Sequence, residues 1–239
     1  RIYKMALPKL NSTPTYEITI PSSGQKASYR PFLVKEQKSL LIAYETQDKK
    51  DMIRSVIRTI EACVEDPIEE KLTTFDVDYL FTKIRAKSVG ETAEVKIKCS
   101  ECSEENEVIV DLDKVEVVGE MLDPLIPITD DVSVKMKYPS YEDFLTNDTI
   151  MNTESEMEGV LELSVSCIDS VLTEDERISL KDEPKEEVVN FIDSMSGKQF
   201  EKITTFISSL PRLSQDIEFE CSNCSHKNNI TLKGMDDFF

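Results

Sequence analysis

The chain has 239 residues, of which 39% are hydrophobic and 31% are charged, so it can bury a core beneath a heavily charged surface. Its 47 acidic and 28 basic side chains give a formal net charge of −19, which argues against nucleic acid or an anionic membrane as the main partner. No apolar run is long enough to cross a bilayer, and the first residues lack the basic-then-apolar pattern of a signal peptide. We therefore expect a cytosolic protein whose cysteines stay reduced.

The N-terminal third has the pattern of a β-hairpin followed by helices. Hydrophobic periodicity and turn residues predict strands at 16–20 and 27–34 around a turn at 21–24, and helices at about 40–44, 48–64 and 76–90. The second helix is expected to begin after a cap at Asp48.

The middle of the chain is richer in helical than in strand patterns. We expect strands at 115–118 and 132–137, helices at 141–145, 156–172, 186–195 and 198–210, and an acidic loop at 173–184. These predictions together indicate a mainly helical segment.

Two distant segments, residues 95–110 and 217–232, repeat one pattern. Each has an alternating strand, a Cys-x-x-Cys turn and a returning alternating strand. The turns contain Cys99 and Cys102 in the first segment and Cys221 and Cys224 in the second. A Ser after each cysteine and an Asn before each returning strand recur as well.

The spacing of these cysteines suits a metal. Two residues between cysteines let a tight turn point both sulfurs at one ion, and two such turns supply the four thiolates of a tetrahedral zinc site with Zn–S distances of about 2.3 Å. Because four thiolates leave no open position for water, we expect one structural zinc per chain. Four thiolates also accept iron, which we rank below zinc.

Disulfides, redox chemistry and chance each fit the cysteine pattern less well than a metal does. Disulfides need an oxidising compartment, which nothing in the sequence suggests. A redox-active Cys-x-x-Cys usually begins a helix, whereas these motifs lie at predicted hairpin tips. Two matched turns without a metal would be a rare coincidence.

The remaining cysteines, the histidine and the C-terminal phenylalanines have ordinary structural interpretations. His226 could replace a cysteine as a ligand, but the four cysteines already complete the site, so we expect an exposed turn residue. Cys63 and Cys167 lie on apolar faces of predicted helices and are expected to be small buried side chains. The terminal Phe238-Phe239 leaves two interpretations open, docking into a partner's groove or packing on the chain's own domain.

The sequence offers little to an enzyme. Its single histidine leaves Ser-His or Cys-His catalysis to His226 alone, and there is no Gly-x-Gly-x-x-Gly or Gly-Lys-Ser/Thr phosphate loop. A zinc-ribbon adaptor that binds nucleic acid or a polymerase is the alternative function. The few lysines of the two cysteine segments are diluted by glutamates, which disfavours that alternative.

Four segments carry a likeness to a known family: residues 6–10 (ALPKL), 29–36 (YRPFLVKE), 81–91 (FTKIRAKSVGE) and 97–102 (IKCSEC). They resemble the T4-type bacteriophage baseplate family, specifically its small hub and hub-assembly proteins. The resemblance implies a non-enzymatic structural or chaperone-like role in a contractile tail baseplate hub, in the host cytoplasm and, if incorporated, in the virion. The implied partners are other baseplate hub proteins, and the surplus of apolar helix faces hints at a homo-oligomer.

We thus predict an α+β chain in four parts. They are an N-terminal hairpin plus helices (1–92), a split zinc ribbon (93–112 and 214–234), a mainly helical insertion (113–213) and a tail (235–239).

Overall fold

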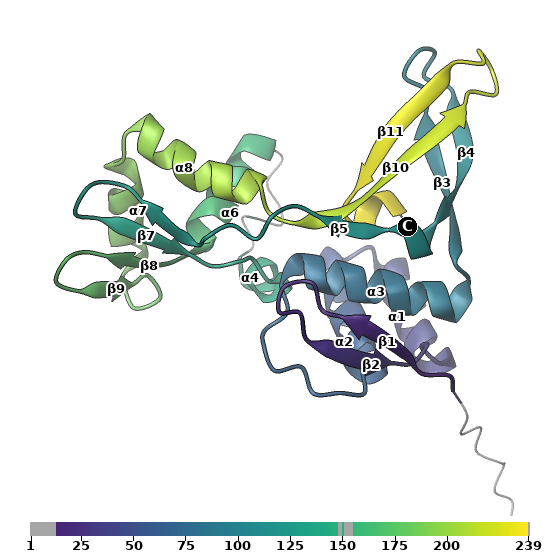
Figure 1. Ribbon diagram of the computed structural model, residues 1–239, viewed down its shortest axis with the longest axis horizontal. Helices are drawn as coiled ribbons and strands as arrows, with labels where there is room; N and C mark the ends of the chain where they lie inside the picture. The colour runs from purple at the N-terminus through teal and green to yellow at the C-terminus, as the bar shows by residue number, and fades with distance from the viewer. Residues whose placement is uncertain (1–12, 148–149, 151–154, 239) are drawn as a thin grey trace, which may run out of the picture.

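The computed structural model describes residues 13–147, 150 and 155–238 (Figure 1). These residues fold around three buried apolar clusters. One cluster lies in the N-terminal lobe, one between the two cysteine hairpins, and one in the segment that connects those hairpins. The segment 6–10 and Phe239 lie outside the described residues. None of the described helices is both long and apolar enough to span a membrane.

The N-terminal lobe packs a hairpin against three helices. Its elements are β1 (Tyr16–Thr19), β2 (Lys26–Tyr29), α1 (Val34–Thr46), α2 (Lys49–Cys63) and α3 (Thr74–Val89). Ile18 and Ala27 of the hairpin pack with Ile60 of α2 and Leu80 of α3. The predicted cap at Asp48 is confirmed, because its carboxylate accepts the backbone N–H groups of the first turn of α2.

The predicted strand at 27–34 is wrong beyond Tyr29. Pro31 has no N–H to donate to a ladder, and the N–H of Phe32 donates to Ser88 Oγ at 2.9 Å. The N–H of Leu33 then donates to the carboxylate of Glu36 at 2.8 Å, which caps a helix. The chain therefore leaves the sheet and begins α1 at residue 34.

The two cysteine segments form the antiparallel hairpins that the alternation predicts. Their strands are β3 (Thr92–Lys98) and β4 (Glu105–Asp111), and β10 (Arg212–Glu220) and β11 (Lys227–Lys233). Between and beside them lie η1 (Leu112–Lys114), β5 (Glu116–Val118), which pairs with β10, and η2 (Met235–Phe238).

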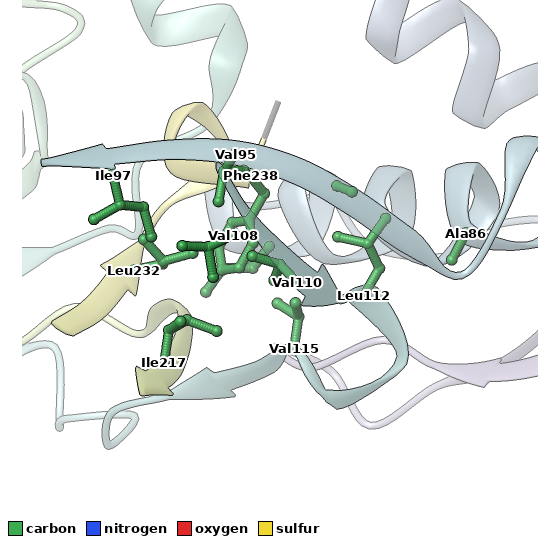
Figure 2. Packing of buried hydrophobic residues seen from close by; sticks show 12 residues of the cluster. Ala86, Val95, Ile97, Val108, Val110, Leu112, Val115, Ile217, Leu232 and Phe238 are labelled. Carbon is green, nitrogen blue, oxygen red and sulfur yellow. The ribbon is translucent and has the colours of Figure 1, made fainter. Parts of the chain in front are cut away.

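The apolar faces of the two hairpins meet and form one core (Figure 2). Val110 and Val115 are fully buried there and share the cluster with Ile217 and Leu232 of the second hairpin. Phe238 is also fully buried in this core, so the idea that it docks into a partner's groove is wrong, and it packs on its own chain.

The segment between the hairpins contains more strand than we predicted, alongside its helices. It contains a four-stranded antiparallel sheet in the order β6-β7-β8-β9 as well as four helices within its described part. These elements are β6 (Leu125–Pro127), β7 (Ser133–Met136), α4 (Tyr141–Thr146), α6 (Glu156–Ser166), β8 (Ile168–Leu172), β9 (Arg177–Ser179), α7 (Lys185–Asp193) and α8 (Gly197–Ser208). Figure 1 shows the sheet and helices as a body to one side of the hairpins.

The predicted helix at 156–172 is wrong in its second half. The helix ends at Ser166, and Ile168–Leu172 forms β8, where Val171 pairs with Val134 of β7. The carbonyl of Cys167 accepts the N–H of Lys137 at 2.7 Å, which turns the chain into the sheet. The predicted loop at 173–184 also contributes a strand, β9.

Candidate metal centre

The structure brings the four predicted cysteines together at the tips of the two hairpins. The Sγ atoms of Cys99 and Cys224 lie 3.7 Å apart, and those of Cys102 and Cys221 lie 3.6 Å apart. All four Sγ atoms lie within 4.8 Å of one another. Each close pair takes one sulfur from each hairpin, across 125 and 119 residues of sequence.

These distances fit a tetrahedral metal. Four sulfurs at about 2.3 Å from a central ion are separated by about 3.8 Å along each edge of the tetrahedron. The sulfur separations of 3.7 and 3.6 Å are close to that edge. A disulfide would need a sulfur–sulfur distance of about 2 Å, and all six cysteines are free thiols. The donor set therefore suits a soft or borderline cation such as zinc.

The two turns have the same backbone design. In the first, the N–H of Cys99 donates to the carbonyl of Glu104 at 2.8 Å, and the N–H of Ser103 donates to the carbonyl of Cys99 at 3.0 Å. In the second, Cys221 pairs with His226 and Ser225 in the same way, at 2.9 Å in both bonds. Ser103 and Ser225 both adopt the left-handed conformation, with φ of 59° and 56°. The sequence repeat is therefore a structural repeat.

Two buried asparagines tie each turn to the opposite hairpin. The side-chain oxygen of Asn228 accepts both the backbone N–H and the hydroxyl of Ser100, each at 2.9 Å. Reciprocally, the side-chain oxygen of Asn106 accepts the backbone N–H and the hydroxyl of Ser222, at 2.9 and 3.0 Å. The same residues recur in the sequence repeat, but no local signal assigns them this role, because each partner lies on the other hairpin.

The asparagine amides also face the sulfurs. Asn228 Nδ2 donates to Cys99 Sγ at 3.5 Å and to the carbonyl of His226 at 3.1 Å. Asn106 Nδ2 lies 3.7 Å from Cys221 Sγ. N–H groups aimed at a sulfur favour the thiolate form, which is the form that binds metal. The asparagines thus hold the cysteine side chains in place, as outer-shell groups do around a metal site.

Hydrogen bonds to the sulfurs separate the acidities of the thiols. The backbone N–H of Cys102, helped by that of Glu101, lowers the pKa of Cys99 to about 6. The backbone N–H of Cys224 likewise lowers the pKa of Cys221. The backbone N–H of His226 favours the Cys224 thiolate, but a hydrogen bond between its thiol and the Cys102 sulfur, together with desolvation, raises the pKa of Cys224 to about 12. A cation at the centre would remove this conflict by compensating several thiolates at once.

The remaining cysteines and the histidine lie as expected. Cys63 and Cys167 are fully buried, and burial raises their pKa values to about 11 and about 12. His226 is exposed in the second turn, where its carbonyl accepts the N–H of Cys221. Among the described residues the cluster of candidate ligands consists of the four cysteines alone.

Comparison of the sequence with known proteins identifies a family that it matches. A family model described as T4 bacteriophage base plate protein matches residues 13–239, which include both hairpins and everything between them. No curated protein and no solved structure matches the chain significantly.

Proposed function

Because the chain belongs to the T4 bacteriophage base plate protein family, it is a phage baseplate structural protein, and we propose that it builds the baseplate hub, as a component or assembly factor, with a structural zinc in its ribbon. The family match bears out the resemblance seen in the sequence. The observation that carries the rest of the proposal is the convergence of four cysteine sulfurs from two distant hairpins.

A structural zinc explains how the hairpin tips are held. The apolar core reaches Ile97 and Ile217, but the turns beyond it carry polar and charged residues. A metal bound by both turns would join the two tips and make one rigid ribbon from segments separated by a long insertion. The free energy of metal binding would then contribute directly to the free energy of folding of the ribbon.

The site supports an architectural role over a catalytic one. A catalytic zinc keeps a coordination position open for water or substrate, and four cysteine thiolates fill a tetrahedral zinc completely. Cys99 and Cys221 are buried, at 3% and 2% exposure, whereas Cys102 and Cys224 are exposed at the tips of the hairpins. We therefore propose that the chain is not an enzyme.

The ribbon surface supports a protein partner. Strands β3, β4 and β10 project glutamates outward, among them the exposed Glu94, Glu107 and Glu218. These charges repel phosphate backbones. We propose other baseplate hub proteins as the partners, met in the host cytoplasm during tail assembly.

Metal analysis tests the zinc. Elemental analysis of the purified protein should find about one zinc per chain. Cys99→Ser and Cys224→Ser should each lower both the metal content and the yield of folded protein. Cys167→Ala is the matched control, because it removes a buried thiol far from the site and should keep the zinc. Fully folded protein with no metal would rule out the zinc clamp.

Purified baseplates test the hub assignment. Cross-linking and mass spectrometry of baseplates and of assembly intermediates, from the phage that encodes this chain, should find it linked to hub subunits. Cross-links only to peripheral baseplate proteins would overturn the hub placement while leaving the baseplate family intact.

A further inference from the structure

Helix α1 exposes a row of large apolar side chains. Val34, Leu41, Ile42 and Tyr44 are 65%, 56%, 63% and 70% exposed, and Leu33 just before the helix is 41% exposed. These five side chains, close together in sequence, are a large share of the twelve exposed large hydrophobic residues of the described chain. Such a concentration marks an interaction surface, because single exposed apolar residues are otherwise scattered.

The opposite side of α1 is firmly attached. Glu36 and Ala43 are its buried residues, and the helix packs along α2. Glu36 is bound by Arg30 at 3.0 Å and accepts the N–H of Leu33. These contacts fix the orientation of α1, so its exposed face points to solvent and can contact a partner without a rearrangement of the helix.

The outer face forms a stripe with helical spacing. Val34, Lys38, Leu41 and Glu45 follow one another at intervals of four, three and four residues, which places them along one side of the helix. Ile42 flanks the stripe. The middle of the stripe is apolar, with a lysine one turn before it and a glutamate one turn after it.

This charge order is complementary to itself. A two-fold axis that passes between Leu41 and Ile42 and is perpendicular to the helix would pair the apolar centre with its own copy. It would also place Lys38 of each copy opposite Glu45 of the other. Both charges lie only about 5 Å along the helix from the axis, given a rise of 1.5 Å per residue, so they stay close across a range of crossing angles.

The local charge also permits self-association. The chain has a net charge of −19, which opposes contact between most faces of two copies. Helix α1 carries two lysines and two glutamates and is formally neutral. It is therefore a face on which two copies can meet without strong repulsion.

We propose that α1 is a homodimer contact, in which Lys38, Leu41, Ile42 and Glu45 pack antiparallel against the same four residues of a second copy of this chain. Two identical faces related by a two-fold axis are the commonest form of homo-oligomer interface. A single pair of short helices buries little area, so the dissociation constant of the dimer is expected in the micromolar range. The proposal is independent of the zinc and of the place in the hub.

Sedimentation equilibrium over the low-micromolar to sub-millimolar range tests it on the intact chain. The wild-type protein should associate to a dimer. Leu41→Gln should weaken the dimer at least tenfold without changing the far-ultraviolet circular dichroism, since Leu41 is already half exposed. Ile109→Gln is the matched control, because Ile109 is 69% exposed on β4, away from α1, and should leave association unchanged.

Charge reversal distinguishes this specific interface from nonspecific hydrophobic association. Lys38→Glu should weaken the dimer about tenfold, because attraction becomes repulsion at two symmetric contacts. The double variant Lys38→Glu/Glu45→Lys should restore association to near the wild-type value. A protein that stays monomeric throughout the range would overturn the proposal, as would a dimer that ignores Leu41→Gln or a double variant as weak as the single one.

Discussion

Asn106 and Asn228 each accept hydrogen bonds from the turn of the opposite hairpin, and we call these two side chains the asparagine braces. Replacing Asn228 by alanine tests whether the braces strengthen metal binding. Asn228 is 3% exposed and makes four contacts: two from Ser100, one to the carbonyl of His226 and one to Cys99 Sγ. Alanine removes all four and leaves the backbone fold of β11 unchanged. The variant therefore isolates the bracing of one turn by the opposite hairpin.

The expected loss follows from the two bonds that Ser100 donates to Asn228 across the hairpins. Each neutral hydrogen bond contributes about 1 kcal/mol net, and the two bonds from Ser100 together contribute about 2 kcal/mol. Ser100 is exposed, so water can take over its N–H and hydroxyl and no further desolvation cost arises. A loss of about 2 kcal/mol corresponds to roughly 30-fold weaker metal binding, within the range seen for outer-shell partners of metal ligands.

Competition with a chromophoric zinc chelator measures that affinity. Asn106→Ala should give a loss of similar size, because its bonds to Ser222 mirror those of Asn228. Asn229→Ala is the control, since Asn229 is exposed on the same strand and should bind zinc like the wild type. If Asn228→Ala and Asn229→Ala have the same affinity, the idea that the braces orient the ligands is wrong.

Three further predictions concern the rest of the chain. Removal of metal by a chelator should raise amide hydrogen exchange in both cysteine hairpins while α2 stays protected, because the buried apolar residues of α2 belong to a separate cluster. Gly119→Ala should lower the free energy of unfolding by about 3 kcal/mol, since φ is +135° and a Cβ would lie 2.8 Å from Pro211 Cα, whereas Gly24→Ala, with open space around it, should cost about 1 kcal/mol in denaturant titrations. Burial raises the pKa of Glu36, but hydrogen bonds from Arg30 and from the N–H of Leu33 outweigh burial and lower it. The stability that the carboxylate provides is therefore complete above a pH of about 4.3 and is lost as the pH falls through the lowered pKa, so the stability difference from Glu36→Gln should shrink on acidification.

The parts of the fold that the sequence predicted well are those with local rules. The cysteine hairpins follow from strict alternation on both arms and from the Cys-x-x-Cys spacing, and their observed register pairs Val95 with Val108 and Ile217 with Ile230. Helix α2 follows from its cap and its apolar spacing. In each case the information lies within one short segment.

The parts that failed depend on partners elsewhere in the chain. Ile168 and Val171 fit a helical spacing as well as a strand, and the strand prevails because β7 and β9 supply ladder partners on both sides. Strands β6 and β9 have three residues each, too few for a periodic signal. The roles of Asn106 and Asn228 were missed for the same reason, because their hydrogen bonds cross between the hairpins.

The apolar core of the ribbon weakens toward the turns, and this gradient supports the proposal of a metal at the tips. Near the base Val110 and Leu213 are fully buried, whereas Val108 and Ile217, nearer the turns, are 9% and 7% exposed, and Phe219 is only partly buried. Hydrophobic burial thus fixes the base of the ribbon, while beyond it the two turns are held by the asparagine braces and the cysteine sulfurs. Loss of the metal should therefore open the ribbon from its tip, with amide exchange rising most next to the cysteines and least beside the base. Uniform exchange along the strands would show that the metal is needed to form the whole ribbon.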